Sequence, residues 1–188
     1  QRRLEEKLAK RKQKDGYDRA VFEDPTSPIH CACLIHGDGY SWDYVDRLYS
    51  MLNRHITRPV VLHVYTEDSR SVYTPYIKHS LVDWGIGGPK KSWWYKLQLF
   101  NSEHYSGPLL YFDLDTVIVN NIDWIWRLNL QHFWGVRDFK YLWRPNFNGT
   151  NSSVMWWDTE KYQHIWDHVK KQKLTDFFRR YHGDQDYI

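Results

Sequence analysis

The sequence predicts an α/β fold with a mostly parallel central sheet, and two observations point to it. Apolar runs of strand length recur along the chain, and stretches with helical periodicity separate them. The runs are apolar throughout, as expected for parallel strands that are buried on both faces. The 188 residues, 41% of them hydrophobic, are enough for one domain with a sizeable core.

The predicted elements follow one another in a regular order. The first strand is expected at Ile29–Ile35, and Ser41 can cap the helix that follows, in which Trp42, Val45 and Leu48 recur at helical spacing. Two further helices are expected, at Ser92–Glu103 and Glu160–Lys171. The remaining strand-like runs are Pro59–Tyr65, Ser80–Trp84, Leu109–Phe112, the β-branched Thr116–Val119, Phe133–Val136 and Ser153–Trp157.

Charge divides the chain into two parts. Residues 1–24 are predicted to be a basic N-terminal helical arm and linker, and residues 25–188 the folded domain, which could be truncated at its C-terminus. Residues 1–20 hold eight of the 26 basic and four of the 23 acidic side chains, a net charge of +4 that leaves −1 for the rest. The domain is therefore not expected to bind nucleic acid. The arm is either a solvated helix or a contact for lipid, nucleic acid or protein.

The two cysteines, Cys31 and Cys33, are two residues apart on the first predicted strand. They share a face there, a geometry that seldom allows a disulfide, and no further cysteine completes a zinc site. Buried thiols are expected, which mildly favours a reducing compartment. Neither a stretch of 18 apolar residues nor a signal-peptide pattern is present, so we expect a cytoplasmic protein, soluble or peripheral at a membrane.

The clearest chemical signal is an apolar strand that ends in Asp113-Leu114-Asp115. In open α/β sheets, ligands bind just beyond the carboxyl ends of the strands. Two carboxylates at that edge repel each other and favour a hard divalent cation, Mn²⁺ or Mg²⁺, between or beside them. Such an ion could bridge a diphosphate and neutralise its charge as it leaves. The alternative interpretation is a pair of solvated turn carboxylates.

Four stretches, in order, strengthen the chemical interpretation: Lys96–Phe100, Gly107–Asp123, Phe147–Met155 and Gly183–Asp186. Together they resemble the glycosyltransferases related to glycogenin and to the bacterial lipopolysaccharide galactosyltransferases. The resemblance implies the Rossmann-like GT-A fold and a hexosyltransferase type of enzyme. It further implies a nucleotide-sugar donor, usually UDP-linked, a carbohydrate or glycan acceptor, Mn²⁺ or Mg²⁺ as cofactor, and retention of anomeric configuration.

The resemblance also assigns roles to individual residues. Asp184 and Gln185 would line the reacting face of the sugar as catalytic residues, although Asp184 could also be a helix C-terminal turn residue. Asn151 could likewise be a turn residue before a strand. The other assignments are Asp38, Tyr40, Lys96 and Asp113 to the nucleotide, Asp138 and Asn151 to the donor sugar, and Asp113 and Asp115 to the metal.

Two departures from the family pattern matter. In the segment expected to hold the base, Asp38 and Tyr40 match, but His36 and Gly37 do not, which puts base specificity in doubt. The family's third metal ligand is a histidine well after the Asp-Gln motif, and the sequence ends at Ile188. His182 is the nearest candidate, although a histidine beside a glycine is more often solvated.

Three other classes compete with this interpretation. A haloacid-dehalogenase-type phosphatase could use Phe112–Asp115 and Gly183–Asp186, but that family places its first motif near the start of the domain. Nucleotidyltransferases need a basic glycine-rich loop, and His36–Gly39 lacks the Arg and Lys. A non-enzymatic carbohydrate-binding protein would explain the 11 tryptophans without needing paired acids at a strand end.

Overall fold

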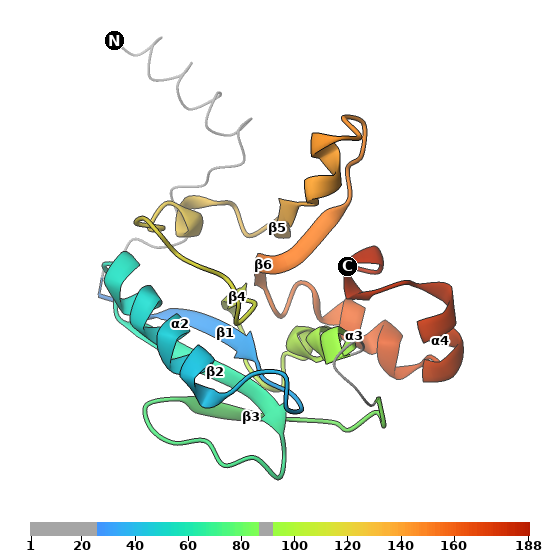
Figure 1. Ribbon diagram of the computed structural model, residues 1–188, viewed down its shortest axis with the longest axis horizontal. Coiled ribbons are helices and arrows are strands. Elements are labelled where there is room, and N and C mark those ends of the chain that lie inside the picture. Colours follow the sequence, from blue (N-terminus) through green and yellow to red (C-terminus); the bar gives the residue numbers. More distant parts are fainter. Residues whose placement is uncertain (1–25, 87–91) are drawn as a thin grey trace.

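The computed structural model describes residues 26–86 and 92–188, so the predicted basic arm lies outside the described residues. A six-stranded sheet forms the centre, in the order β3-β2-β1-β4-β6-β5 (Figure 1). The strands β3, β2, β1 and β4 pair in parallel, whereas β6 is antiparallel to both of its neighbours. The predicted α/β fold with a mostly parallel sheet is confirmed. The strands are β1 (Ile29–Leu34), β2 (Val60–Glu67), β3 (Ile77–Leu81), β4 (Pro108–Phe112), β5 (Trp134–Arg137) and β6 (Thr150–Asp158).

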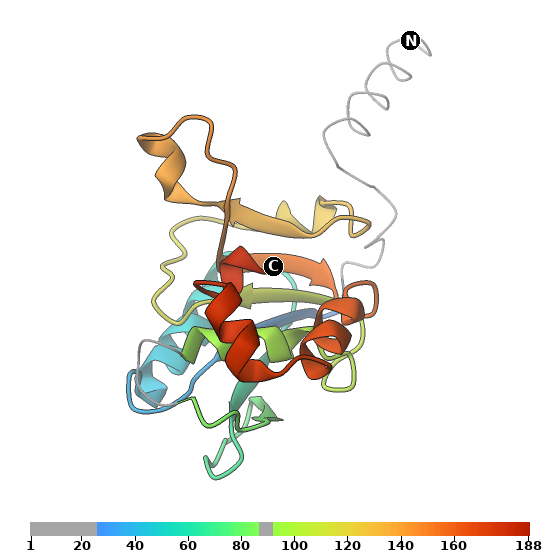
Figure 2. The same ribbon diagram turned by 90° about the vertical axis from the view of Figure 1, so that its right-hand side faces the viewer.

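Helices cover both faces of the sheet (Figures 1 and 2). The longest, α2 (Trp42–His55), packs its buried Val45, Leu48 and Leu52 against one face. The other face is covered by η1 (Ser92–Phe100), α3 (Gln163–Lys170) and α4 (Leu174–Arg180). Three shorter 3₁₀ helices complete the described part: η2 (Ile125–Arg127), η3 (Phe139–Leu142) and η4 (Asp184–Asp186). None of the helices in the described ranges is long and apolar enough to cross a bilayer.

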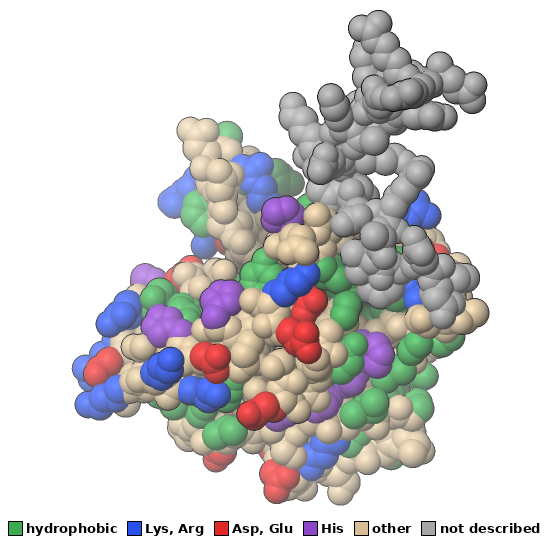
Figure 3. Space-filling view, turned by 180° about the vertical axis from the view of Figure 1, so that it is seen from behind, with side chains coloured by type: hydrophobic (Ala, Val, Ile, Leu, Met, Phe, Trp, Pro, Cys, Tyr) green, Lys and Arg blue, Asp and Glu red, His purple; other side chains and the backbone are tan. Residues whose placement is uncertain are grey.

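Two hydrophobic cores result, one on each side of the sheet. Alternate residues of β1 belong to different cores, since Cys31 and Cys33 point to the α2 side and Ala32 to the η1 side. Both thiols are free and fully buried, as predicted, and burial raises their pKa. The second core is the more aromatic, with Trp94 and Trp157 among its buried side chains. Over α3 and α4 the outer surface is basic (Figure 3), with exposed Lys170, Lys171, Lys173, Arg179 and Arg180.

A row of three histidines crosses the η1 side of the sheet. His30 Nδ1 lies 2.9 Å from His63 Nε2, and His63 Nδ1 lies 2.7 Å from His79 Nε2, so each pair shares one hydrogen bond. Tyr105 stacks on His30, and His104 packs edge-on against His79. Burial first, and then the neighbouring imidazoles, lower the pKa of His63 to about 3 and that of His79 to about 4.

Several boundaries differ from the sequence-based prediction for identifiable reasons. The third strand spans Ile77–Leu81 instead of Ser80–Trp84, because the Gln98 side chain pairs with both the N–H and the C=O of Val82, the next residue after the strand. Thr116–Val119 is not a strand, and two of its apolar side chains, Val117 and Val119, are exposed. The third helix starts at Gln163 because the Asp158 carboxylate accepts the N–H groups of Glu160 and Lys161 in the turn before the helix.

Candidate active site

A polar cavity of about 720 Å³ lies beyond the carboxyl end of β4. We call it the site cavity. Because β6 is antiparallel to β4, the start of β6 lies beside the end of β4, and Phe112 pairs with Val154. The walls therefore come from segments far apart in the sequence: Trp93, Lys96, Asp113, Lys140, Phe147, Ser152, Ser153, His182, Gly183, Asp184, Gln185 and Asp186.

Lys96 holds the centre of this cavity. It comes from η1 and is buried, with only 8% of its surface exposed. Its Nζ lies 2.7 Å from Asp113 Oδ1 and 3.0 Å from Asp113 Oδ2, and it donates to Ser152 Oγ at 3.1 Å. The same Nζ is 3.9 Å from Asp184 Oδ2. A buried ammonium needs such partners, since an unpaired charge in this position would be costly.

Asp113 is fixed by its position directly after β4. Its backbone N–H donates to Ser153 O at 2.8 Å, and its Oδ1 accepts the Tyr111 hydroxyl at 2.7 Å. Burial, followed by the negative charge of Asp113, raises the pKa of Tyr111 well above its usual value. Tyr111 therefore stays a neutral donor and holds the carboxylate in place.

Asp184 approaches the same ammonium from η4, although it is distant from Asp113 in sequence. It is 4% exposed, and its Oδ2 has no hydrogen-bond partner within the described structure. Burial raises the pKa of Asp184, and the positive charge of Lys96 opposes that rise. Raised pKa values combined with a cleft position are typical of functional carboxyl groups. Gln185, the residue after Asp184, also lines the cavity.

The second carboxylate of the Asp113-Leu114-Asp115 turn has different surroundings. Asp115 is exposed, and its Oδ2 accepts the Tyr40 hydroxyl at 3.2 Å. Burial and then Asp115 raise the pKa of Tyr40. Asp38 lies exposed in the turn two residues before Tyr40. The structure thus brings Tyr40 and Asp115 together, outside the residues that line the site cavity.

Asp113 and Asp115 supply the oxygen ligands that a hard divalent cation prefers, but two carboxylates are too few to complete its coordination. Among residues 26–86 and 92–188, no three His, Cys, Asp or Glu side chains gather to hold a metal ion. Both oxygens of Asp113 already contact Lys96. His182 is 98% exposed at its side chain and pairs with Asp186. A cation at Asp113 and Asp115 would therefore need further oxygens, from a diphosphate or from water.

The two residues assigned to the donor sugar have local backbone partners instead. Asp138 accepts the N–H of Lys140 at 2.8 Å and so caps η3. Asn151 accepts the N–H of Ser153 at 2.9 Å. Neither residue lines the site cavity, so their assignment to the sugar stays a prediction.

Several cavity residues were not identified from the sequence. Ser152 is one of them, because its place depends on the pairing of β6 with β4. Trp93 could have been found, since residues three apart in a 3₁₀ helix lie on the same side, and Trp93 precedes Lys96 by three. Lys140 and Phe147 come from the segment between β5 and β6, where the Lys140 ammonium lies 5.2 Å from the Phe147 ring centre.

Comparisons with known proteins bear on the fold. No protein-family model matches the sequence, and a search of curated proteins gave no match. Among solved structures, the glycosyltransferase GlyE of Streptococcus pneumoniae TIGR4 is similar, with a TM-score of 0.59 at 12% identity over 86% of this chain. The apo form of GlyE gives a TM-score of 0.55 at 14% identity, again over 86% of this chain.

This chain spans 42% of the length of both GlyE structures. At such low identity the likeness establishes the fold alone. The narrower resemblance to glycogenin and the lipopolysaccharide galactosyltransferases stays a prediction. The sheet order and the strand directions are those of a Rossmann-like GT-A fold, and the structural neighbours agree with it. This is the fold that the sequence predicted.

Proposed function

We propose that this chain is the catalytic domain of a glycosyltransferase that takes its sugar from a nucleotide-sugar donor. The observation that carries the proposal is the placement of Lys96 between Asp113 and Asp184 at the carboxyl edge of the parallel strands. In α/β sheets this edge is where ligands bind. A buried ammonium with carboxylates on two sides suits a ligand that joins an anionic diphosphate to a neutral, hydroxyl-rich sugar.

Each residue would contribute a distinct function. Lys96 would exchange part of its contact with Asp113 for a phosphate oxygen of the donor. Asp113 and Asp115 would hold Mn²⁺ or Mg²⁺, which when bound would stabilise the negative charge of the departing diphosphate. Asp184, with Gln185 beside it, would face the sugar and orient a hydroxyl or stabilise positive charge at the anomeric carbon.

The finer assignments rest on the resemblance of the sequence motifs. They favour a UDP-linked hexose, a carbohydrate or glycan acceptor and retention of configuration. Tyr40, whose hydroxyl donates to Asp115, would stack its ring on the base. The anomeric configuration of a purified product, determined by NMR, tests retention directly.

Nucleotide binding is the first test of the proposal. Titration calorimetry with a panel of nucleoside diphosphates, with and without Mn²⁺, should show metal-dependent binding by the full chain. Lys96→Met would leave two carboxylates without their cation, so it is best made together with Asp184→Asn, and this double variant should lose most of the affinity. Lys161→Met is the matched control, since Lys161 is exposed and, within the described residues, its ammonium pairs with Asp158.

Turnover separates this proposal from the other classes. A glycosyltransferase should slowly hydrolyse its nucleotide-sugar without acceptor, releasing the nucleoside diphosphate, whereas a carbohydrate-binding protein should not. A phosphatase should release inorganic phosphate from a simple aryl phosphate. Absence of nucleoside diphosphate binding at millimolar metal, for every base tested, would refute the glycosyltransferase proposal.

A further inference from the structure

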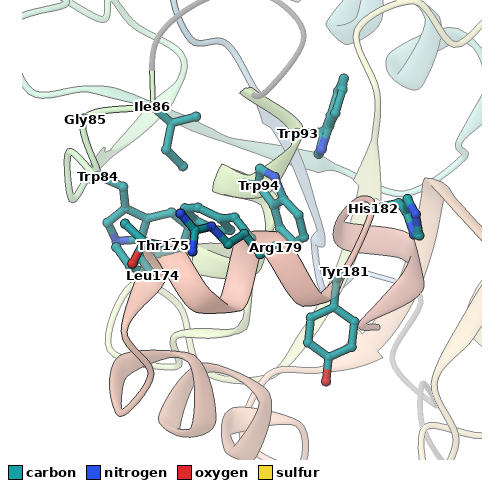
Figure 4. A pocket seen from close by; sticks show the side chains of 11 residues that line it. Trp84, Gly85, Ile86, Trp93, Trp94, Leu174, Thr175, Arg179, Tyr181 and His182 are labelled. Atoms are coloured by element: carbon teal, nitrogen blue, oxygen red, sulfur yellow. The ribbon is translucent and has the colours of Figure 1, made fainter.

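A second cavity, of about 450 Å³, lies next to the site cavity. We call it the aromatic cavity and define it by Trp84, Trp93, Trp94, Thr175, Phe178 and His182. Two of these residues, Trp93 and His182, line both cavities, so the two are contiguous. In Figure 4, Trp84 and Trp94 face the residues of α4, while Trp93 and His182 lie at the other end.

The aromatic walls are held in place by stacking. The Trp84 ring is stacked 5.5 Å from Tyr95 at an interplanar angle of 14°, and 6.0 Å from Trp166 at 20°. Trp94 is buried and lies 4.7 Å from Phe178. Rings packed in this way hold the cavity open without a ligand, and its volume is within the usual range for small-molecule sites.

An unused hydrogen-bond donor lies at the junction of the two cavities. The indole Nε1 of Trp93 is buried and has no partner within the described structure. Gly183 lies beside this nitrogen, since a β-carbon at position 183 would be 3.6 Å from it. Because residue 183 is a glycine, it has no side chain to cover the indole N–H. A buried N–H without an acceptor is unfavourable, and a ligand oxygen would remove that cost.

We infer that the aromatic cavity binds a sugar ring of the acceptor. The C–H faces of a pyranose would pack on Trp84 and Trp94, while the partly polar rim at Thr175 and His182 suits its hydroxyls. Trp93 Nε1 would donate to one of its oxygens and direct that end of the sugar toward Asp184. The inference rests on the proposed function, since it assigns the acceptor side of the same site.

Direct binding can be tested without a donor. Methyl hexopyranosides at millimolar concentration should give saturation-transfer NMR signals on their ring C–H protons with the full chain, and a nucleoside diphosphate with Mn²⁺ should not displace them. Thr175→Trp fills the cavity from an exposed position and so should not disturb the core. It should weaken hexoside binding by about tenfold or more, equivalent to at least about 1.4 kcal/mol. Trp124→Leu, at an exposed tryptophan that does not line the aromatic cavity, is the control.

Kinetic measurements connect binding to transfer. In Thr175→Trp and in Trp84→Leu, the KM for the acceptor should rise about tenfold or more, while nucleoside diphosphate affinity stays within about twofold of wild type. Trp93→Phe keeps a ring and removes the N–H, so it should raise the acceptor KM by several-fold. If Trp84→Leu fails to fold, Thr175→Trp still decides the question.

The outcomes separate the two claims. Wild-type nucleotide binding with an acceptor KM that Thr175→Trp leaves unchanged would overturn this inference and spare the proposed function. Failure of the wild-type chain to bind any nucleoside diphosphate would overturn both. A dimer in light scattering that Thr175→Trp dissociates, with hexoside binding unaltered, would identify the cavity as an interface between copies and also overturn the inference.

Discussion

Asp184 Oδ2 lies 3.9 Å from Lys96 Nζ, makes no hydrogen bond within the described structure and is almost fully buried. The ammonium that compensates its charge is already bonded to Asp113 and Ser152. The carboxylate is therefore held close to a cation without a direct hydrogen bond to it. A group kept in this condition is under-satisfied in the free protein and available to a ligand.

The first prediction follows from that relationship. Asp184→Asn should lower kcat by about 10²-fold, because it removes the charge that faces the sugar, and should leave nucleoside diphosphate affinity nearly unchanged. Steady-state kinetics and calorimetry on the same preparation measure both quantities. Asp176→Asn, at an exposed position in the first turn of α4, is the control and should alter neither.

The same substitution should not weaken the fold. Because the folded-state pKa of Asp184 is raised, its contribution to stability is present while the carboxyl is protonated and is lost as pH rises through that pKa. A neutral Asn should therefore keep or raise Tm at pH 7, with a smaller effect at pH 4. A marked drop in Tm at pH 7 would show that the ionised carboxylate is structural.

The second prediction concerns the metal. Asp115→Asn should reduce metal-dependent turnover by about 10²-fold or more while leaving Tm within about a degree of wild type, because Asp115 is exposed and bonds only to Tyr40 among the described contacts. Turnover is measured across a Mn²⁺ titration. Asp43→Asn, in the first turn of α2, is the exposed control. Turnover close to that of the wild type would remove Asp115 from the site.

The third prediction is an acid-sensitive fold. The pKa of His63 is about 3 in the folded protein, below the ordinary value of 6.5, so the unfolded chain binds the proton first as pH falls. Stability from this group is complete above pH 6.5 and is lost progressively as pH falls toward 3. The loss between pH 7 and pH 5 should be about 2 kcal/mol for His63 alone.

Urea denaturation at the two pH values measures the loss. His63→Gln should reduce this pH dependence by about that amount, with the part due to His79 remaining, whereas His164→Gln, at an exposed position on α3, should leave it unchanged. An unfolding free energy that is the same at pH 5 and pH 7 would contradict the prediction.

The fourth prediction concerns the N-terminal segment. Deleting residues 1–24 should leave nucleotide-sugar hydrolysis unchanged, because the described sheet begins at Ile29 and, among the described residues, those that line the site cavity are Trp93 or later. Hydrolysis rate and Tm of the shortened chain check it. A collapse of Tm would show that the segment packs on the core.

The sequence predicted the strands best where a strand is buried on both faces of the sheet. The runs that became β1, β2 and β4 are buried on both faces of the sheet, so each run is mainly apolar and recognisable, with His30 and His63 as the exceptions. Hydrophobic patterning failed for Thr116–Val119, whose β-branched residues are exposed in a connecting segment. Nothing in local propensity separates an exposed apolar segment from an edge strand.

The candidate site was predictable only in part. Asp113 and Asp115 stand out because two acids end an apolar strand, and Lys96 and Asp184 were selected through the family resemblance. Ser152 could not be predicted, because its contact with Lys96 requires β6 to run antiparallel beside β4. Sequence periodicity gives the face of a strand, but it does not give the neighbour or the direction.

The antiparallel direction of β6 means that the site is built from residues synthesised at different times. Lys96 and Asp113 leave the ribosome early, Ser152 later and Asp184 near the end of this sequence, yet all four meet around one nitrogen. All six strands of the sheet precede Gly183 in the sequence. The sheet can therefore be complete without the last carboxylate, whereas the site cavity is complete only when the η4 segment packs beside β6 and η1.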